Sequence, residues 1–264
     1  MSGLEDAIRA SLEKLGPLPT MEEAAAAKNL SVDKTSLAYW FPKLVDASIP
    51  VPQTILVPLT DDARRAIWAT FDGEQAGDPQ SFFAALRAAA EEVGYPAFLR
   101  TAQTSAKHCW DKSCFIRNHD DFPSHVTQIV EFSECASLIG LDWELWAVRE
   151  MLPSIIYGHC PKYDNMPVAK EFRFFVADGE VRCFHPYWPL ESLRTGGWRG
   201  TAEDYAKLCD PDEHAEELRA LAVRVSTAIA GAWSVDILQT ERGWYVTDMA
   251  EAHKSFHWEG CEKS

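Results

Sequence analysis

The chain has 264 residues, of which 47% are hydrophobic and 25% are charged, and its formal net charge at pH 7 is −15. This length and composition are typical of a folded protein with one large domain or two smaller ones, and they exclude a chain that is disordered throughout. The negative charge argues against nonspecific binding to nucleic acid or to an anionic membrane. A phosphate ligand would therefore need local positive contacts in a cleft.

The sequence contains no segment that we expect to enter a membrane. No uninterrupted apolar run approaches the length of a membrane span, and the charged, amphipathic segment Met1 to Lys14 does not resemble a secretory signal. Seven scattered cysteines indicate reduced thiols, so we expect a cytoplasmic protein. Two groups of histidine and cysteine, His108-Cys109 with Cys114 and His253 with His257, lack the spacing of a closed zinc site.

The first half of the chain is expected to form helices and short strands. Residues 1–50 are predicted to be helical, because alanines 24–27 favour helix and residues 31–47 carry apolar side chains at helical spacing. After Pro50 and Pro52 the predicted elements are a strand at 54–57, a helix from Thr60 or Asp61 to about Ala69, a helix at 80–93 and a strand at 97–101. The order of helix, glycine and strand indicates an α/β layer.

The second half is expected to contain more strand. A polar loop at 102–112 precedes a strand at 114–117, a helix from Asp120 or Asp121 into the 130s, a strand at 143–151, an irregular stretch at 187–210 and a long helix at 212–231. The dipeptide Asp178-Gly179 between alternating runs at 170–177 and 180–184 predicts a hairpin.

Strand periodicity gives this hairpin one charged face and one apolar face. Glu171, Arg173 and Phe175 share the first face, and the apolar residues between them belong to the core. An acid and a base side by side suit the wall of a cleft that holds a charged ligand, although an ordinary surface ion pair has the same pattern.

The last hairpin joins Trp233 to Thr240 with Trp244 to Met249 through a three-residue loop that ends at Gly243. This register pairs Thr240 with Trp244 and places Asp236 opposite Asp248. Two facing carboxylates repel each other, and a divalent cation such as Mg²⁺ between them would reverse that effect. Glu251 could complete the set, and two exposed acids on a solvent face remain the alternative.

Three other segments offer groups that could bind a nucleotide. Arg100 ends an apolar strand, where open α/β sheets bind ligands. Lys107 lies in a loop of small residues that could close over phosphates, although the loop lacks the glycine spacing of a P-loop. Glu150, Met151 and Leu152 end a strand and could face an adenine ring with backbone and apolar groups, or they could simply be a buried strand with one exposed acid.

In chain order these pieces resemble the ATP-grasp superfamily, including small phage and bacterial ATP-grasp proteins and the eukaryotic translation-factor assembly chaperones of the same fold. The similarity covers roughly residues 36–258. The matching elements are Ile49-Pro-Val-Pro-Gln-Thr54, Pro96-Ala-Phe-Leu-Arg100, the loop with Lys107, Arg149-Glu-Met-Leu152, Lys170-Glu-Phe-Arg173, Ser234-Val-Asp236 and Val246-Thr-Asp248.

The resemblance implies an α+β fold in which two α+β lobes clamp ATP. It implies an N-terminal helical extension at 1–35, an α/β subdomain at 36–95, a central lobe with the phosphate loop at 96–152 and a C-terminal lobe with the metal site at 153–264. The implied nucleotide contacts are Arg100 at the α- and β-phosphates, Lys107 on the phosphate loop, Glu150, Met151 and Leu152 at the adenine, Glu171, and Arg173 at the γ-phosphate.

The implied metal is Mg²⁺, held by Asp236 and Asp248 with Glu251. The family's last metal motif ends in asparagine, and Ala250 stands at that position. The implied activity is an ATP- and Mg²⁺-dependent ligase that joins an unidentified carboxylate to an amine through an acyl phosphate, with Arg173 and Lys107 as catalytic residues. The alternatives are an ATP-binding assembly chaperone or binding module with little turnover, which Ala250 favours, and a phosphotransferase. The acceptor is expected near Tyr187 to Trp198, a stretch rich in aromatic residues and arginine.

Overall fold

The computed structural model describes residues 33–136, 141–258 and 261, which form two compact units. Of the described residues, one unit contains 53–136 and 141–151, and the other contains 33–52, 152–258 and 261. The helices expected within residues 1–32 lie outside the described part of the chain. The division into four segments stays a prediction. None of the helices within the described ranges has the length and apolarity needed to traverse a membrane.

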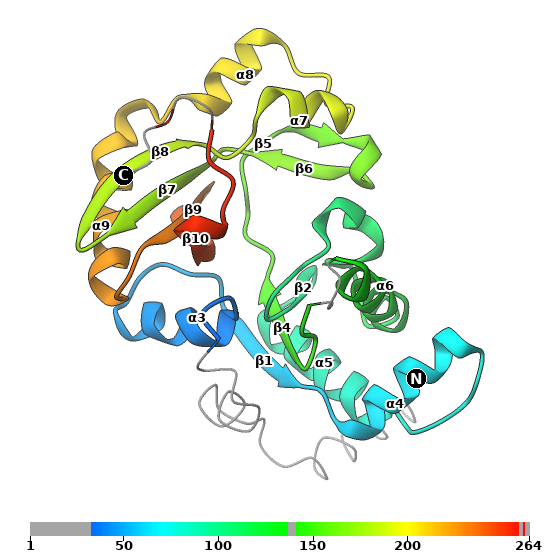
Figure 1. The fold of residues 1–264 in the computed structure, drawn as a ribbon. Coiled ribbons are helices and arrows are strands. Elements are labelled where there is room, and N and C mark those ends of the chain that lie inside the picture. The colour runs from blue at the N-terminus through cyan, green and yellow to red at the C-terminus, as the bar shows by residue number, and fades with distance from the viewer. Residues whose placement is uncertain (1–32, 137–140, 259–260, 262–264) are drawn as a thin grey trace. The chain divides into compact units, whose positions relative to one another are not determined.

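The first unit is built on a four-stranded antiparallel sheet (Figure 1). Its strands, in spatial order, are β1 (Thr54–Pro58), β4 (Leu145–Glu150), β2 (Ala97–Thr101) and β3 (Phe115–Ile116). The expected α/β layer is therefore wrong in its strand direction, because every neighbour in this sheet is antiparallel. A helix followed by a strand does not by itself fix how that strand pairs.

Helices of the first unit begin and end at residues with clear local causes. The hydroxyl of Thr60 accepts a hydrogen bond from the amide of Ala63 at 3.1 Å and caps the first helix, which ends at the left-handed Gly73. Phe82 and Trp146 pack edge to face inside the core and tie the second helix to the sheet. The helices are α4 (Asp61–Asp72), α5 (Gln80–Val93), α6 (Phe122–Cys135) and the 3₁₀ turn η1 (Lys107–Lys112).

The second unit is built on another four-stranded antiparallel sheet and a separate two-stranded ribbon. The larger sheet has the order β10 (Gly243–Glu251), β9 (Trp233–Thr240), β7 (Glu171–Ala177) and β8 (Glu180–Pro186). The ribbon pairs β5 (Ile156–Cys160) with β6 (Met166–Ala169). Phe172, Phe174 and Val176 are buried under α9 (Ala215–Ala228), which packs along β7 and β8 (Figure 1).

Two expectations about the helices of this unit are wrong. The stretch 187–210 is not irregular, because it contains two short helices, and a capping box between Thr201 and Asp204 starts the second. The long helix at 212–231 begins as a 3₁₀ turn and becomes α-helical at Ala215, since Asp212 has a left-handed φ of 52°. The remaining helical elements are α3 (Leu37–Asp46), η2 (Pro161–Tyr163), α7 (Leu190–Thr195), α8 (Ala202–Cys209), η3 (Asp212–His214) and η4 (Ala252–Lys254).

The last hairpin reaches the predicted pairing of acids by a different route. Thr240 pairs with Gly243, so the loop has two residues and the expected pairing of Thr240 with Trp244 is wrong. A β-bulge between Val246 and Asp248 then shifts the register by one residue. Asp248 consequently pairs with Asp236, as predicted.

Candidate functional site

A bidentate ion pair joins the two central strands of the second sheet. Arg173 on β7 and Asp236 on β9 are register partners. The guanidinium Nε donates to Oδ1 at 2.7 Å and Nη2 donates to Oδ2 at 2.8 Å. Their side chains are only 16% and 7% exposed, so little water screens the pair. Burial alone would lower the pKa of Arg173, but the charge and hydrogen bonds of Asp236 outweigh it and raise the pKa.

This pair changes how the facing acids must be understood. The repulsion expected between Asp236 and Asp248 was the sequence argument for a bound cation, yet Arg173 already places a positive charge on Asp236. The half-buried Asp248 accepts a hydrogen bond from the amide of Met249 at 3.0 Å. The two acids therefore do not need a metal ion merely to coexist, and a metal role must be supported by other observations.

Thr247, the bulged residue, connects three strands of this charged face. Its hydroxyl lies 3.0 Å from a carboxylate oxygen of Glu171 and 3.3 Å from the backbone carbonyl oxygen of Asp236. Glu171 is only 9% exposed, so this contact helps to satisfy a buried acid. Glu171, Arg173, Asp236, Asp248 and Thr247 together form what we call the charged face. Alternation predicted three of its members from the strands, but the role of Thr247 was not foreseen, because a bulge has no clear sequence signal here.

Two further groups hold the guanidinium of Arg173 from outside the sheet. The ring of Tyr187 lies beneath it, 4.9 Å from ring centroid to Cζ. Nη1 also lies 3.4 Å from the carbonyl oxygen of Phe256, in the segment that follows β10. Tyr187, which was assigned by exclusion to an acceptor pocket, is therefore a contact of Arg173.

Glu251 is turned toward a different partner. Its carboxylate lies 2.7 Å from the ammonium of Lys254, and this hydrogen bond lowers the pKa of the acid. Although all three predicted metal ligands are described, the side-chain oxygens of Asp236, Asp248 and Glu251 do not all come within 4.8 Å of one another. Asp236 and Asp248 are thus neighbours by register, and Glu251 does not close the set in this geometry. Ala250 pairs with Ser234 across the same strands.

The candidate phosphate contacts of the first unit lie on β2 and on the turn after it. Arg100 is 5% exposed, and its Nε donates to the carbonyl oxygen of Thr101 at 3.0 Å. The hydroxyl of Thr101 accepts hydrogen bonds from the amides of Gln103 and Thr104, which folds the following segment into a tight turn. Lys107 begins the 3₁₀ turn η1 and is half-buried, so the segment expected to be a polar loop contains an ordered turn.

The three residues predicted to face the adenine lie at the end of β4 and directly after it. The carboxylate of Glu150 accepts from the amide of Gln53 at 2.9 Å, and the amide of Glu150 donates to the Gln53 carbonyl at 2.9 Å. Met151 is half-buried. Leu152, in the second unit, is 7% exposed and its carbonyl accepts from the amide of Ser154 at 2.8 Å. These contacts order the backbone, and the adenine role stays a prediction.

The second unit also contains an open pocket of about 480 Å³ beside its two-stranded ribbon. Trp198 closes one side, and its indole nitrogen donates to the carbonyl of Tyr157 at 3.0 Å. The lining residues are Tyr157, Gly158, His159, Pro161, Gly197, Trp198, Arg199 and Gly200. The end of the stretch that was expected to bind an acceptor thus contributes to a cavity.

The two antiparallel sheets with their helices form the α+β architecture of the ATP-grasp fold. The chain belongs to an ATP-grasp domain family, the third family of its clade, whose model matches residues 89–256, more than half of the sequence. No curated protein matches the sequence. The predicted resemblance and fold class are confirmed.

Solved structures resemble the chain at low sequence identity. C-terminally truncated Cdc123 from Schizosaccharomyces pombe has a TM-score of 0.51 and 11% identity, over 83% of this chain and 85% of that one. The N5-carboxyaminoimidazole synthase of Aspergillus clavatus, complexed with ADP and 5-aminoimidazole ribonucleotide, has a TM-score of 0.49 and 14% identity, over 89% of this chain and 51% of that one. A RimK domain ATP-grasp protein from Sphaerobacter thermophilus has a TM-score of 0.42 and 16% identity, over 82% and 57%. The chain therefore spans only 57% of the Sphaerobacter protein and 51% of the Aspergillus protein.

Proposed function

We propose that the protein is an ATP- and Mg²⁺-dependent ligase that joins a carboxylate to an amine through an acyl phosphate. The observation that carries this proposal is the charged face in a member of the ATP-grasp family: a buried guanidinium fixed by Asp236, with Asp248 paired beside it. A rigid cation next to carboxylate oxygens suits a ligand that bears phosphate and a hard metal ion. All seven cysteines are free, which supports a cytoplasmic location.

In the proposed reaction, a substrate carboxylate oxygen attacks the γ-phosphorus of ATP, the bond to the bridging oxygen breaks and ADP leaves. The amine then attacks the acyl carbon of the mixed anhydride, phosphate departs, and the nitrogen loses a proton. The protein's contribution would be positioning and charge stabilisation rather than covalent chemistry. Arg173 and Lys107 would hold the transferred phosphoryl group, and Arg100 would contact the α- and β-phosphates.

The chemistry of the charged face fits Mg²⁺ in part. Asp236 and Asp248 provide hard oxygen ligands on paired positions. A carboxylate has about four lone-pair sites, so Asp236 can accept from Arg173 and still contact a metal ion. Glu251 would join them only after leaving Lys254. Bound Mg²⁺ would neutralise charge on the phosphates.

The remaining nucleotide contacts in this proposal are Glu150, Met151 and Leu152 at the adenine and Glu171 near Arg173. Glu171 already has a hydroxyl partner in Thr247. The acceptor would use the pocket lined by Trp198 and Arg199. Its aromatic and cationic lining suits an acceptor that carries a carboxylate.

A second candidate function is an ATP-binding module, such as an assembly chaperone, with little turnover. Ala250 favours it, because a methyl group stands where the family uses a ligand amide. The engagement of both oxygens of Asp236 by Arg173 points the same way, since it leaves fewer lone pairs for metal. Weaker metal coordination harms turnover more than binding.

Incubation of the full chain with ATP, Mg²⁺ and a pool of amino acids and short peptides would test the proposal. Substrate-stimulated release of both ADP and phosphate supports the ligase. A phosphorylated product without free phosphate would indicate a phosphotransferase instead. ATP binding by calorimetry with no stimulated release would support the binding module and contradict the ligase.

A further inference from the structure

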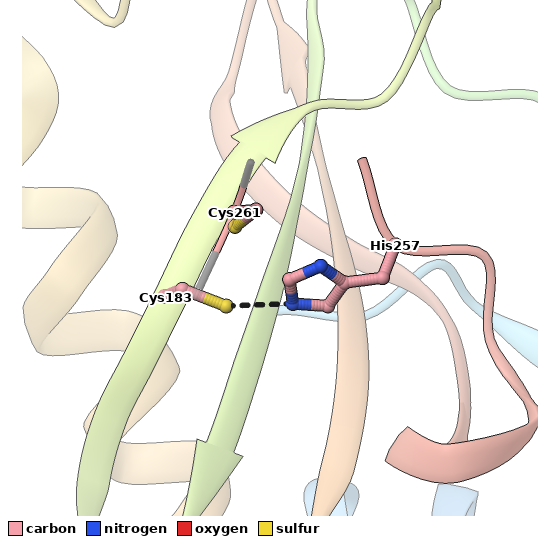
Figure 2. A group of neighbouring side chains, drawn as sticks. All are labelled: Cys183, His257 and Cys261. Carbon is pink, nitrogen blue, oxygen red and sulfur yellow. Dashed lines mark hydrogen bonds between the residues drawn. The ribbon is translucent and has the colours of Figure 1, made fainter. Parts of the chain in front are cut away.

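Three metal-ligating side chains converge on the second unit. Cys183 comes from β8, and His257 and Cys261 come from the segment after β10 (Figure 2). One ligand atom from each lies within 4.8 Å of the other two, and the thiol of Cys183 is 3.0 Å from Nε2 of His257. In the described ranges of the chain, this is the one such group of three or more potential ligands. The sequence pattern considered His257 only with His253.

The hydrogen bonds of His257 prepare its ring for binding a metal ion. Nδ1 lies 3.3 Å from the carbonyl oxygen of Trp258. A carbonyl can only accept, so Nδ1 carries the proton and Nε2, the nitrogen beside Cys183, presents its lone pair. Histidines that bind metal ions usually donate their other nitrogen in this way. The ring is also fixed by Phe175, with the ring centroids 4.2 Å apart.

A second buried imidazole beside the group has a nitrogen without a partner. His185, which is 5% exposed, donates from Nδ1 to the carbonyl of Pro186 at 2.8 Å. Its Nε2 is buried and has no hydrogen-bond partner in the described structure. His185 follows Cys183 by two residues, so both project from the same face of β8. Its ring centroid is 5.7 Å from that of His257. An unsatisfied buried nitrogen is costly, and a nearby ligand would remove that cost.

We propose that Cys183, His257 and Cys261 bind a zinc-class divalent ion, with His185 as the neighbouring candidate for the fourth position. Two thiols and an imidazole form a soft ligand set that Zn²⁺ prefers and Mg²⁺ does not. The thiols lose their protons when the ion binds. This site is separate from the charged face in ligand chemistry and does not depend on the proposed ligase activity.

The ion would fasten the segment after β10 to the sheet. His257 and Cys261 belong to that segment, and Cys183 belongs to β8. The carbonyl of Phe256, next to His257, also lies 3.4 Å from the guanidinium of Arg173. The proposed role is therefore structural: the ion holds in place the backbone that contacts Arg173.

Titration of the reduced, metal-free full chain with Co²⁺ tests this proposal without any measurement of activity. We expect one cobalt ion per chain, a thiolate-to-cobalt charge-transfer absorption, and displacement by Zn²⁺. Cys183→Ser and Cys261→Ser should each weaken binding by about 100-fold or more and reduce the absorption per bound ion, because each removes a thiolate ligand. Cys209→Ser is the matched control, since it removes a partly buried thiol of the same unit outside the group.

A wild-type chain that gives no charge-transfer absorption would overturn the proposal. Unchanged binding in both Cys183→Ser and Cys261→Ser would also overturn it. Circular dichroism reports whether each variant folds. If Cys183→Ser does not fold, Cys261→Ser decides the question, because residue 261 lies outside the strands of the sheet.

Discussion

The guanidinium of Arg173 holds both carboxylate oxygens of Asp236, although the two residues are 63 positions apart in the sequence. Because the pair is mostly buried, removal of one partner leaves the other charged and poorly solvated. Asp236→Leu is expected to lower the free energy of unfolding by about 3 kcal/mol, the lower end for a buried pair, because Arg173 keeps some exposure. Urea denaturation followed by circular dichroism measures this change.

A double-mutant cycle tests whether the loss comes from the unpaired charge. Arg173→Met combined with Asp236→Leu should be less destabilising than the sum of the two single variants, since the double variant leaves no buried charge. Strictly additive effects would show that the ion pair does not couple the two strands energetically.

Asp248 provides the test of the metal assignment. Asp248→Asn keeps the size of the side chain and its acceptor for the amide of Met249, but removes the charge. We expect Mg²⁺-dependent turnover to fall about 100-fold, or roughly 2.7 kcal/mol of transition-state stabilisation, with little change in stability. Glu241→Gln, in the exposed turn of the same hairpin, is the control with an equal change in charge. Wild-type turnover in Asp248→Asn would contradict the assignment.

Lys170 is a buried cation with one recorded carboxylate partner. Its ammonium lies 2.6 Å from Asp212, and the two side chains are 3% and 51% exposed. Asp212→Asn should lower the free energy of unfolding by about 1–2 kcal/mol, because water reaches the acid and screens part of the interaction. Asparagine tolerates the left-handed φ of 52° at this position, so backbone strain does not explain a loss. Glu213→Gln, one residue away and exposed, should be neutral by the same denaturation assay.

His125 should make the stability of the protein depend on pH in mildly acidic solution. Burial lowers the pKa of His125 below its usual value of 6.5, and Arg117 also lowers it, while Asp121, Asp111 and the carbonyl of Ser113 oppose the shift. The unfolded chain therefore takes up a proton near pH 6.5 that the folded chain resists. The free energy of unfolding should be constant above about pH 7.5 and decrease as the pH falls through 6.5.

Denaturant midpoints at several pH values measure this effect. His125→Gln has no titrating ring and should show a smaller decrease between about pH 7.5 and 5.5 than the wild type. His119→Gln, at an exposed position on the preceding turn, is the control. An identical pH profile in His125→Gln and wild type would contradict the prediction.

The elements with strong local signals could be predicted from the sequence. The helix at Gln80–Val93 and the strand at Ala97–Thr101 match the predicted bounds, because a regular apolar face ends at Gly94 and Pro96. The hairpin around Asp178-Gly179 forms where expected, since both residues adopt the left-handed conformation that such turns need. These features depend on neighbouring residues only.

Features that depend on distant contacts could not be predicted. The helices at Leu190–Thr195 and Ala202–Cys209 are too short for a clear apolar period, and tertiary packing around Leu193 and Leu208 stabilises them. The ion pair between Arg173 and Asp236 was missed because it needs the register of two strands that are far apart in sequence. The meeting of Cys183 with Cys261 was missed for the same reason.

The extra residue at Thr247 makes this part of the chain sensitive to insertion and deletion. In an uninterrupted ladder after the two-residue turn, Thr247 would oppose Asp236 and the next acid would point toward Trp244 and Val246, into hydrocarbon. A single codon lost between positions 241 and 248 would therefore exchange the inner and outer sides of everything downstream on that strand. Natural length variation should be tolerated before Trp233 far more readily than within this ribbon.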